Sequence, residues 1–507
     1  MSVEEEWTAD ANEALTISLV KHSDSGLKRI ESFNPKFTYA IFGEEERIFG
    51  YKGLKINLQF NANDMRPNVS VTWNKKFQTV SEVEAFDVVE TLKEFLPGVA
   101  FQKKGEYELA AKSIPKSWTP PGELIKTFER GSETYGVWKG SLADHAVKQL
   151  VNRIQILVLL YIEGGSYIGK DADGKDEPDY SLARWNVYFL YKRRVNEAGR
   201  IEYIFHGYST VYNFWLFEPL TPPSSPPKLI EPRADDSWEL PHGDLPYTEI
   251  PHRARISQFV ILPPYQGQGC GAMLYNTIFE TQLTDPTTKE VTVEDPNEAF
   301  DLLRDLCDMK YLRANVAEFD ELTVTPDISV PQKGGVLHHN LQVTHANSAT
   351  SPKAIVDIEA LDAIRAKVKI APRQFHRLVE MHLMSKLPPS VRPVPESSEE
   401  TMGPPKTSKP SAADQNVYTL WRLLLKQRLY RRNAGILAEF EITERIIKLN
   451  ETLENVEWEY ARILERLNAP KPYAENGEEA VNGKGKRKAD TEENGGPSSK
   501  KARVEGA

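Results

Sequence analysis

The chain has 507 residues, which corresponds to about three folded units, and its 63 basic and 73 acidic side chains give a net charge of −10. Two cysteines exclude a disulfide scaffold and a cysteine-rich zinc site, and the longest apolar run, 156–162, is far shorter than the roughly 20 residues of a membrane-spanning helix. The acidic N-terminus has no apolar signal core, so we expect a reduced, soluble, intracellular protein.

The first segment, residues 1–135, has a mixed α and β pattern. Apolar and polar residues alternate over 49–60, which is typical of a strand. Residues 79–82, Thr-Val-Ser-Glu, match a capping box, and apolar residues then recur at helical spacing as far as Leu96. Pro97-Gly98 ends this predicted helix. We expect an α/β domain here.

The second segment, residues 136–325, predicts one sheet with helices packed on it. Apolar, β-branched and aromatic runs predict strands over 153–162, 185–191 and 201–217. Nine prolines between 218 and 252 exclude a helix or central strand there and mark an insertion. The later elements are strand 256–262, helix 272–282, strand 290–293 and helix 297–311. Hairpin-like strands followed by β-α-β-α predict an α+β fold with a mixed, mostly antiparallel sheet flanked by helices.

The third segment, residues 326–470, is predicted to be a helical domain. Apolar residues recur every three or four positions over 355–386 and over 417–467. Between them, 388–413 is rich in Pro, Ser and Thr and is typical of a flexible linker. Residues 471–507 have no apolar pattern, so we expect a disordered tail.

Charge is unevenly distributed between the tail and the rest of the chain. The last 24 residues carry seven basic and four acidic side chains, which leaves a net charge of −13 on residues 1–483. An acidic body disfavours DNA as the main ligand and favours a cationic protein or peptide, although a surplus of charge for solubility explains it equally well. The basic clusters 484–488 and 500–503 resemble a bipartite nuclear import signal, or else belong to a solvated tail.

The most informative motif lies between a predicted strand and a predicted helix. Residues 259–272 read Phe-Val-Ile-Leu-Pro-Pro-Tyr-Gln-Gly-Gln-Gly-Cys-Gly-Ala. Glycines let the backbone approach a ligand closely, and the N–H groups of a helix start, aided by the helix dipole, bind phosphate. Cys270 suggests an acyl-cysteine relay, but no base accompanies it in the sequence, so we interpret it as a small residue at the helix start.

Three interpretations of this motif remain open. It is a turn with packing value only, a Rossmann fingerprint (Gly267-x-Gly269-x-x-Ala272), or the Gln266-x-x-Gly269-x-Gly271 signature of the N-acetyltransferase superfamily. In the third case it holds the pyrophosphate of acetyl-coenzyme A. The antiparallel-looking strands and the proline-rich loop before the motif argue against the Rossmann interpretation.

Two adjacent carboxylates, Glu294 and Asp295, follow the next predicted strand. A lysine amine has a pKa of about 10.4, so its deprotonation near neutral pH costs about 4 kcal/mol, and a nearby carboxylate can accept that proton. We expect Glu294 to be the more catalytic of the two and Asp295 to act mainly as a helix N-cap. Glu163, at the end of the predicted 156–162 strand, is a third candidate acid, or else a surface acid before a turn.

Together these residues resemble a known family. Residues 261–272, the block Val-Glu-Asp-Pro-Asn-Glu-Ala-Phe at 293–300 and Phe-Gly-Tyr-Lys-Gly-Leu-Lys at 49–55 are similar to the catalytic subunit of the type B histone acetyltransferase, within the GNAT N-acetyltransferase superfamily. The resemblance covers residues 10–325. It implies a GNAT-type sheet and acetylation of tail lysines of newly made histone H4 (with H3), for chromatin assembly. It also implies acetyl-coenzyme A as co-substrate, no metal, and a WD-repeat histone chaperone as partner.

The resemblance also implies site residues. The general base falls on Glu294, with Asp295 and Glu163 as nearby acids. The implied acetyl-coenzyme A contacts are Phe259, Val260, Ile261, Gln266, Gly267, Gln268, Gly269, Cys270, Gly271, Ala272 and Asn297. The implied histone-tail contacts are Glu44, Glu45, Glu46, Trp185, Tyr212, Asn213 and Phe214. Acids and aromatic faces suit a lysine-rich tail, but Trp185 as a core residue and 44–46 as a solvated turn remain open.

Further expectations concern partners and alternatives. Insertion 218–252, with Trp238 and Leu240, is a candidate docking segment for the WD-repeat partner. The histidines match no metal-ligand spacing, so we expect no metal, and we expect neither direct DNA binding nor a membrane. Nuclear and cytoplasmic localisation is expected. A NAD-dependent oxidoreductase and a non-catalytic histone chaperone subunit that works through 355–470 stay open as alternatives.

Overall fold

The computed structural model describes nine stretches of the chain. They are residues 6–23, 26–78, 83–115, 117–171, 173–195, 201–216, 250–325, 355–395 and 409–469. The predicted import signal, most of the proline-rich insertion and the tail after residue 469 lie outside them.

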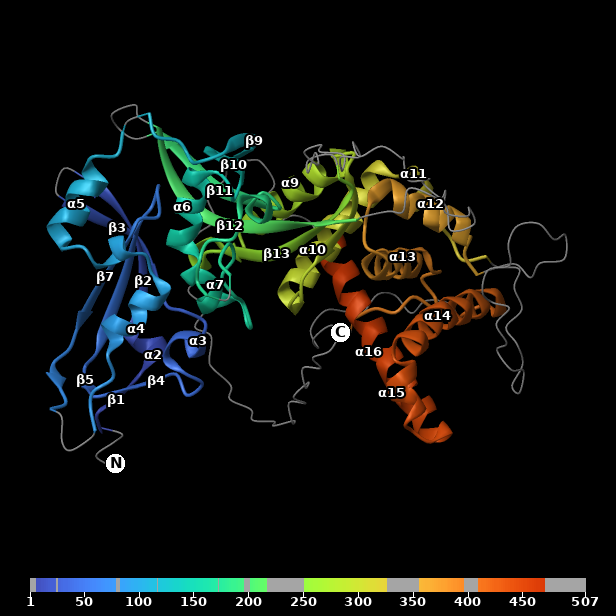
Figure 1. Ribbon diagram of the computed structural model, residues 1–507. Coiled ribbons are helices and arrows are strands. Elements are labelled where there is room, and N and C mark those ends of the chain that lie inside the picture. The colour runs from blue at the N-terminus through green and yellow to red at the C-terminus, as the bar shows by residue number, and fades with distance from the viewer. Residues whose placement is uncertain are drawn as a thin grey trace, which may run out of the picture. The chain divides into compact units, whose positions relative to one another are not determined.

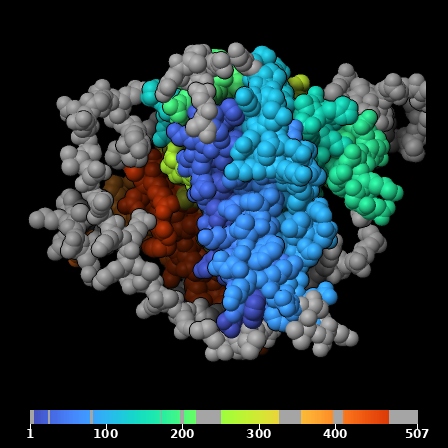
Figure 2. Space-filling model, turned by 90° about the vertical axis from the view of Figure 1, so that its left-hand side faces the viewer, coloured from blue at the N-terminus to red at the C-terminus, as the bar shows by residue number. Residues whose placement is uncertain are grey.

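A four-stranded sheet organises the N-terminal part (Figures 1 and 2, blue). Its order is β3 (Gly26–Phe33), β2 (Leu15–Ser23), β6 (Lys55–Asn61), β7 (Pro67–Thr72), and β2 and β6 run parallel. The alternation predicted over 49–60 is confirmed in β6, where Ile56, Leu58 and Phe60 are buried. Two small ribbons flank this sheet, β1 (Thr8–Asp10) with β4 (Arg47–Phe49) and β5 (Tyr51–Lys52) with β8 (Lys75–Lys76). The helices of this part are α2 (Ala11–Ala14), α3 (Tyr39–Phe42), α4 (Val88–Phe95) and α5 (Lys104–Lys112), with a 3-10 turn at Gly98–Phe101.

A six-stranded sheet forms the centre of the chain (Figure 1, teal to yellow-green). Its order is β14 (Thr288–Val293), β13 (His252–Ile261), β12 (Ile201–Trp215), β11 (Trp185–Val195), β10 (Glu133–Ser141), β9 (Glu123–Arg130). Every neighbouring pair is antiparallel except β13 and β14. The predicted α+β fold with a mixed, mostly antiparallel sheet is therefore confirmed. Residue 135 lies inside β10, so the proposed boundary at 135/136 falls within the β9–β10 hairpin.

Helices cover both faces of this sheet. Helix α9 (Cys270–Thr284) contacts β11 to β14, and its Gln282 donates a hydrogen bond to the Tyr188 hydroxyl. Helix α7 (Ile156–Tyr161) contacts β13 on the other face, where Gln258 donates to the Ser166 carbonyl. The remaining helices of this part are α6 (His145–Ile154), α8 (Asp179–Leu182), α10 (Glu298–Asn315) and α11 (Ala317–Asp320).

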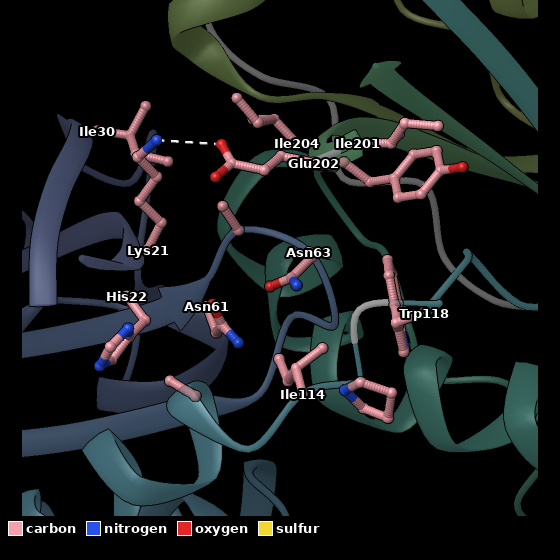
Figure 3. Close-up of a pocket in the computed structure, with 14 residues that line it drawn as sticks. Lys21, His22, Ile30, Asn61, Asn63, Ile114, Trp118, Ile201, Glu202 and Ile204 are labelled. Atoms are coloured by element: carbon pink, nitrogen blue, oxygen red, sulfur yellow. Dashed lines mark hydrogen bonds and ion pairs between the residues drawn. The ribbon is translucent and has the colours of Figure 1, made fainter. Parts of the chain in front are cut away.

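Polar contacts join the two sheets. The Arg153 guanidinium donates to the Asp64 carbonyl at 2.7 Å and to its carboxylate at 3.0 Å, and the Tyr191 hydroxyl donates to the Asn63 carbonyl at 2.9 Å. Figure 3 shows the edge of this junction, where Lys21 of β2 pairs with Glu202 of β12 at 3.1 Å beside a cavity of about 160 Å³. The N-terminal sheet is thereby fixed to the central one.

The C-terminal part is helical, as predicted (Figure 1, orange to red). Its helices are α12 (Ile358–Val368), α13 (Pro372–Lys386), α14 (Ala412–Arg432), α15 (Ala434–Ala438) and α16 (Ile442–Asn468). Glu380 of α13 is buried and accepts hydrogen bonds from Arg428 of α14 and Tyr460 of α16. None of the described helices is apolar and long enough to cross a membrane.

The prediction of a strand over 153–162 is wrong, because this run forms the end of α6 and all of α7. Asp144 caps α6 by accepting from the N–H groups of Ala146 and Val147. Five successive residues of α7, 156–160, are buried. A fully buried helix has no polar face, so periodicity alone does not separate it from a buried strand.

Two helix boundaries also differ from those predicted. Helix α4 begins after Asp87, whose side chain accepts from the N–H groups of Val89 and Glu90, and not after the predicted capping box at 79–82, which lies outside the described residues. The helical stretch 355–386 is two helices, because Lys369 adopts a left-handed conformation and Pro372 begins α13.

Candidate functional site

The central sheet opens at the middle of β13. Strand β14 pairs with β13 only from His252 to Ile256, whereas β13 continues to Ile261. Leu262 donates its N–H to the His206 carbonyl on β12, so the alternation of an extended strand directs the N–H groups of Phe259 and Ile261 towards the opposite, β14 side. A backbone edge of five residues, 257–261, is therefore available to pair with an extended ligand.

The irregularity that opens the strand is a β-bulge at Ser257. Thr210 pairs with Gln258 and Val211 with Ile256, so Ser257 has no partner on β12. Its hydroxyl oxygen is buried and has no hydrogen-bond partner among the described residues. An orphaned polar atom at the point where two strands separate fits a ligand that passes there.

The glycine turn lies at the far end of the open edge. Gly267 and Gly269 have φ angles of 71° and 79°, and Gly269 is the N-cap residue of α9, so its left-handed conformation requires glycine. No atom lies within 4 Å of the position of an added Cβ on Gly267. The Gln266 side chain donates to the Ile261 carbonyl at 2.8 Å, which ties the turn to the end of β13. The exposed stretch 266–269 leads directly into the N-terminus of a 15-residue helix, whose unpaired N–H groups and dipole favour an anion there.

A cation that the sequence analysis missed stands beside this turn. An Arg130 Nη1 atom lies 3.2 Å from the position that a Cβ on Gly269 would occupy. Arg130 is the last residue of β9, and only the three-dimensional pairing of β9 with the rest of the sheet brings it to the turn. No local signal in the sequence identifies it. An arginine at a helix N-terminus strengthens a phosphate site.

Cys270 is buried next to the same turn. Burial raises the pKa of its thiol to about 11, against smaller lowering effects of Arg130 and Lys192. The thiol is therefore protonated near neutral pH and is a poor nucleophile. This agrees with the interpretation of Cys270 as a small residue at the helix start. Gly271 faces α10, where a Cβ would lie 3.2 Å from Leu303.

The aromatic candidates and Glu294 share one face of the sheet. Trp185 pairs with Tyr212, Tyr212 with Arg255, and Arg255 with Thr292, so these four residues form a row across four strands. Side chains directly opposite one another lie on the same face, and Glu294 follows Thr292 by two residues, which keeps it on that face. The rings of Trp185 and Tyr212 are 4.7 Å apart.

Glu294 lies at the end of this row. Its backbone N–H donates to the Ile256 carbonyl at 2.9 Å, which fixes its position beside the opening of the sheet. Its side chain is 44% exposed, and one carboxylate oxygen is 3.7 Å from the Arg255 Nε atom. The carboxylate is thus accessible and faces a cation rather than a buried partner.

Asp295 and Asn297, which follow Glu294 in the chain, have roles that differ from those predicted. The N-cap of α10 is Asn297, whose side chain accepts from the Phe300 N–H at 2.9 Å, so the predicted capping role of Asp295 is wrong. Asp295 instead has a φ angle of 35°, in the left-handed region. The oxygen of Asn297, a predicted cofactor contact, is occupied by this cap. Ring contact between Phe259 and Phe300, at 5.0 Å, packs the predicted cofactor strand against α10.

Glu163 lies on the same side of the sheet as Glu294, but it follows a helix and not a strand. The loop after α7 is held from two directions, because Gly164 donates its N–H to the Tyr39 hydroxyl at 2.8 Å and the Ser166 carbonyl accepts from Gln258 at 2.8 Å. Gln258 is two residues beyond Ile256, the partner of Glu294. The side chain of Glu163 is exposed.

The three consecutive acids 44–46 separate into two groups. Glu46 accepts hydrogen bonds from the N–H of Thr38 and, at 3.1 Å, from that of Tyr39, and so caps the N-terminus of α3. It also accepts from the Asn12 amide at 2.8 Å. Glu44 and Glu45 are exposed, and their carboxylates form no hydrogen bond with a described residue.

Asn213 and Phe214 continue β12 beyond Tyr212. Asn213 donates its N–H to the Arg184 carbonyl at 2.9 Å, and the Arg184 guanidinium lies 4.4 Å above the Tyr212 ring. Phe214 is 47% exposed, which is unusual for a large apolar residue in a central strand. This end of the sheet therefore carries accessible aromatic surface beside cations and carboxylates.

The residues at the opening of β13 fit acetyl-coenzyme A. The edge 257–261 offers strand N–H groups to an amide-bearing arm, and the turn 266–269 with Arg130 offers donors and positive charge to a pyrophosphate. Val260 and Ile261 are buried and Ala272 of α9 is half-buried, so their side chains pack inside. The backbone of Ile261 faces the open edge, whereas that of Val260 faces β12. Gln268 is exposed and donates to the Pro264 carbonyl at 2.8 Å.

The described residues contain no candidate metal site. No group of three or more His, Cys, Asp or Glu residues in the described ranges is arranged to hold a metal ion. His206, which stacks on Tyr265 with ring centroids 3.6 Å apart, is buried, and burial lowers its pKa to about 4. It is neutral near pH 7 and belongs to the packing of the sheet.

Comparison with known proteins shows two family matches. Residues 7–163 match the model described as "Histone acetyl transferase HAT1 N-terminus", and residues 339–388 match "Fungal HAT1, C-terminal". The second match covers α12 and α13 of the helical region.

Curated relatives match the whole chain. The histone acetyltransferase type B catalytic subunit of Gibberella zeae is 46% identical over 509 residues, covering 99% of both chains. Those of Pyricularia oryzae and Neurospora crassa are 44% and 42% identical, each covering 99% or more of both chains. The mostly antiparallel sheet also contradicts the Rossmann interpretation of the glycine turn, because only β13 and β14 run parallel in that sheet. The chain is therefore an acetyltransferase and belongs to the family of type B histone acetyltransferase catalytic subunits.

Proposed function

We propose that this chain transfers the acetyl group of acetyl-coenzyme A to lysines in the N-terminal tail of newly synthesised histone H4, in support of chromatin assembly. The observation that carries the proposal is the position of Glu294, which ends the row Trp185, Tyr212, Arg255 and Thr292 on one face and borders the opening of β13. From Ile256 to Ile261 the strand extends about 17 Å, which separates the carboxylate from the glycine turn. An extended donor along this edge connects the two.

Glu294 acts as the general base in this proposal. A lysine amine must lose a proton before it attacks a thioester, and an accessible carboxylate takes that proton directly or through one water. The backbone of Glu294 is fixed by its hydrogen bond to Ile256, and Arg255 lies beside its side chain, so the carboxylate is held in place at the opening. The amine then attacks directly, in a ternary complex.

Acetyl-coenzyme A supplies the acetyl thioester. The strand N–H groups of Phe259 and Ile261 orient this donor and stabilise negative charge on the carbonyl oxygen during attack. The amides of 267–269 and the Arg130 guanidinium hold its pyrophosphate, because the Gln266 N–H already donates to the Pro263 carbonyl. Because the Cys270 thiol is buried and protonated, it is a poor nucleophile, and the proposal includes no acyl-cysteine step.

The histone tail is proposed to cross the face that carries Trp185 and Tyr212. Their rings offer apolar surface to a lysine stem, and Glu44, Glu45 and Glu163 are exposed acids on the segments that border this face. Phe214 adds exposed aromatic surface at one end. Glu46 is committed to the α3 cap, so its contribution is to position 44–45.

The test replaces the proposed base and keeps its shape. Glu294→Gln should lower kcat on an H4 tail peptide at least about 100-fold, with KM for acetyl-coenzyme A changed less than about threefold. Glu298→Gln, on an exposed residue of the first turn of α10, is the matched control and should leave both constants unchanged. Unchanged turnover in Glu294→Gln would remove this residue from the role. Radiolabelled acetyl-coenzyme A with peptides blocked at single lysines then shows which lysines are used.

We also propose that a WD-repeat histone chaperone subunit binds insertion 218–252, with Trp238 and Leu240 as apolar anchors. Residues 217–249 lie outside the described residues, so the proposal rests on the length and composition of this insertion. Deleting 222–248 should abolish co-purification of the partner and preserve acetylation of a free peptide. Retained co-purification contradicts the proposal.

Nuclear and cytoplasmic localisation is proposed from the basic clusters 484–488 and 500–503. Replacing the basic residues of both clusters by alanine should shift a fluorescent fusion to the cytoplasm. The same replacement at one cluster should give an intermediate distribution, and an unchanged distribution would contradict the proposal.

A further inference from the structure

A cavity of about 820 Å³ lies between α12, α13 and α14, and nothing in the proposed acetyl transfer uses it. Its volume is within the range of about 300–1,000 Å³ that small-molecule sites occupy. The cavity is lined entirely by described residues of the helical region. It is separate from the opening of β13, because it shares no lining residue with the glycine turn or with Glu294.

The floor of the cavity is apolar. Val356, Leu361 and Val379 are buried and line it, and Ile355, Ile358 and Leu424 complete the surface. These residues come from three different elements, so the surface exists only when the helices are packed. An apolar floor of this kind fits an aliphatic chain or another nonpolar group.

The rim of the cavity is cationic. Four arginines line it, namely Arg373, Arg428, Arg431 and Arg432. Arg428 is neutralised by Glu380, at 2.6 Å, whereas neither Arg373 nor Arg432 forms an ion pair of 4 Å or less with any described residue. The only other carboxylate in the lining is Asp362, which is exposed on α12. Positive charge therefore exceeds negative charge around the opening.

The arginines influence one another. The pKa of Arg373 is lowered by burial and then by the nearby charge of Arg432. The pKa of His376, another lining residue, is lowered by burial and by Arg428, so its imidazole is neutral near pH 7. Mutual repulsion of uncompensated guanidinium groups is relieved when an anion binds between them.

We propose that this cavity binds an amphiphilic organic anion, an aliphatic carboxylate such as a fatty acid, with its chain on the apolar floor and its carboxylate between Arg373 and Arg432. Arginine binds carboxylates in a bidentate manner, and the floor removes the chain from water. The cationic histone tail is repelled by this rim and is not the occupant. The proposal does not depend on the acetyl-transfer proposal, because the two sites share no residue.

The test measures binding to the full-length protein by isothermal titration calorimetry. Dodecanoate, used below its micelle concentration, should bind at one site, and dodecanol and dodecyltrimethylammonium should bind at least about 10-fold more weakly. A tenfold difference corresponds to about 1.4 kcal/mol. Equal affinity for the three ligands would mean nonspecific apolar binding, and no dodecanoate binding would also overturn the proposal.

Two variants locate the ligand. The double variant Arg373→Ala/Arg432→Ala should weaken dodecanoate binding at least about 10-fold, whereas Arg462→Ala/Arg466→Ala, at two exposed positions of α16, should leave it unchanged. Ile358→Trp should block the cavity and abolish binding, and Ile442→Trp, on an exposed residue of α16, is its matched control. Unfolding temperatures show that each variant is folded. Binding retained in Ile358→Trp contradicts the assigned site.

Discussion

Single residues at the glycine turn determine how closely a phosphate can approach the backbone. Gly269 combines a φ angle of 79° with the N-cap position of α9 and the nearby Arg130 guanidinium. A side chain at this position strains the backbone and displaces the arginine. The turn is thus a site where a small change affects cofactor binding more than stability.

Gly269→Ala should raise KM for acetyl-coenzyme A at least about 10-fold and lower the free energy of unfolding by about 1 kcal/mol. Steady-state kinetics and urea denaturation measure the two effects. Gly435→Ala is the matched control, because Gly435 is helical and no atom lies within 4 Å of its added Cβ. That variant should be as stable as the parent or more so, with KM unchanged. An unchanged KM in Gly269→Ala would contradict the assigned pyrophosphate site.

Arg130 is a residue-scale feature that only the folded sheet reveals. Arg130→Ala should raise KM for acetyl-coenzyme A about 5- to 50-fold and reduce the salt dependence of that constant, because one cation is lost from the phosphate site. Arg130→Lys should recover part of the loss. Kinetics at two ionic strengths measure both effects, and Arg47→Ala, an exposed arginine of β4, is the control. A change in kcat alone would argue for a structural role instead.

Elements differ in how well the sequence predicts them. Strand β6 has one buried face, and its alternation was sufficient to predict it. Helix α7 is buried all round, so its apolar run matched a strand equally well. The turn at 266–271 was predictable because glycine and helix-start chemistry are local, whereas Arg130 and the committed role of Glu46 depend on contacts between distant segments.

The packing of α9, α10 and α13 contains a buried acid, Asp308, that should make stability depend on pH. Asp308 accepts from the Tyr275 hydroxyl at 2.7 Å and from the Gln374 amide at 3.2 Å, and burial raises its pKa from 3.8 to about 7. The unfolded chain ionises this acid near pH 4, while the folded chain retains its proton up to about pH 7. The unfolded state therefore binds fewer protons in this window, and stability falls as the pH rises through it.

Asp308→Asn should remove this part of the pH dependence. In the parent, the free energy of unfolding should fall as the pH rises from 4.5 to 7.5. In Asp308→Asn this fall should be smaller by about 2–4 kcal/mol. Urea denaturation at several pH values measures it. Asp362→Asn, at an exposed position of α12, should leave the profile unchanged. A parallel shift of the whole curve in Asp308→Asn, without a change of slope, would contradict the assignment.

At the scale of the whole molecule, the proposed tail-binding face takes residues from the N-terminal part and from the central sheet. Glu44 and Glu45 follow α3 in the N-terminal part, whereas Trp185, Tyr212 and Glu294 belong to the central sheet. Their relative positions depend on the junction in which Arg153 of α6 bonds to Asp64. The Arg153 and Asp64 side chains are only 9% and 13% exposed, so this is a nearly buried ion pair.

Breaking this pair should cost stability and substrate binding together. Asp64→Ala leaves the Arg153 guanidinium buried without its carboxylate, which should lower the free energy of unfolding by about 3–5 kcal/mol. Asp64→Ala/Arg153→Met removes both charges and should recover at least half of that loss, because no unpaired charge remains. In Asp64→Ala, KM for the H4 peptide should rise more than KM for acetyl-coenzyme A, since the proposed cofactor site lies within the central sheet and the proposed tail site spans both. Equal rises in both constants would mean general destabilisation and would contradict the division of the two sites between the sheets.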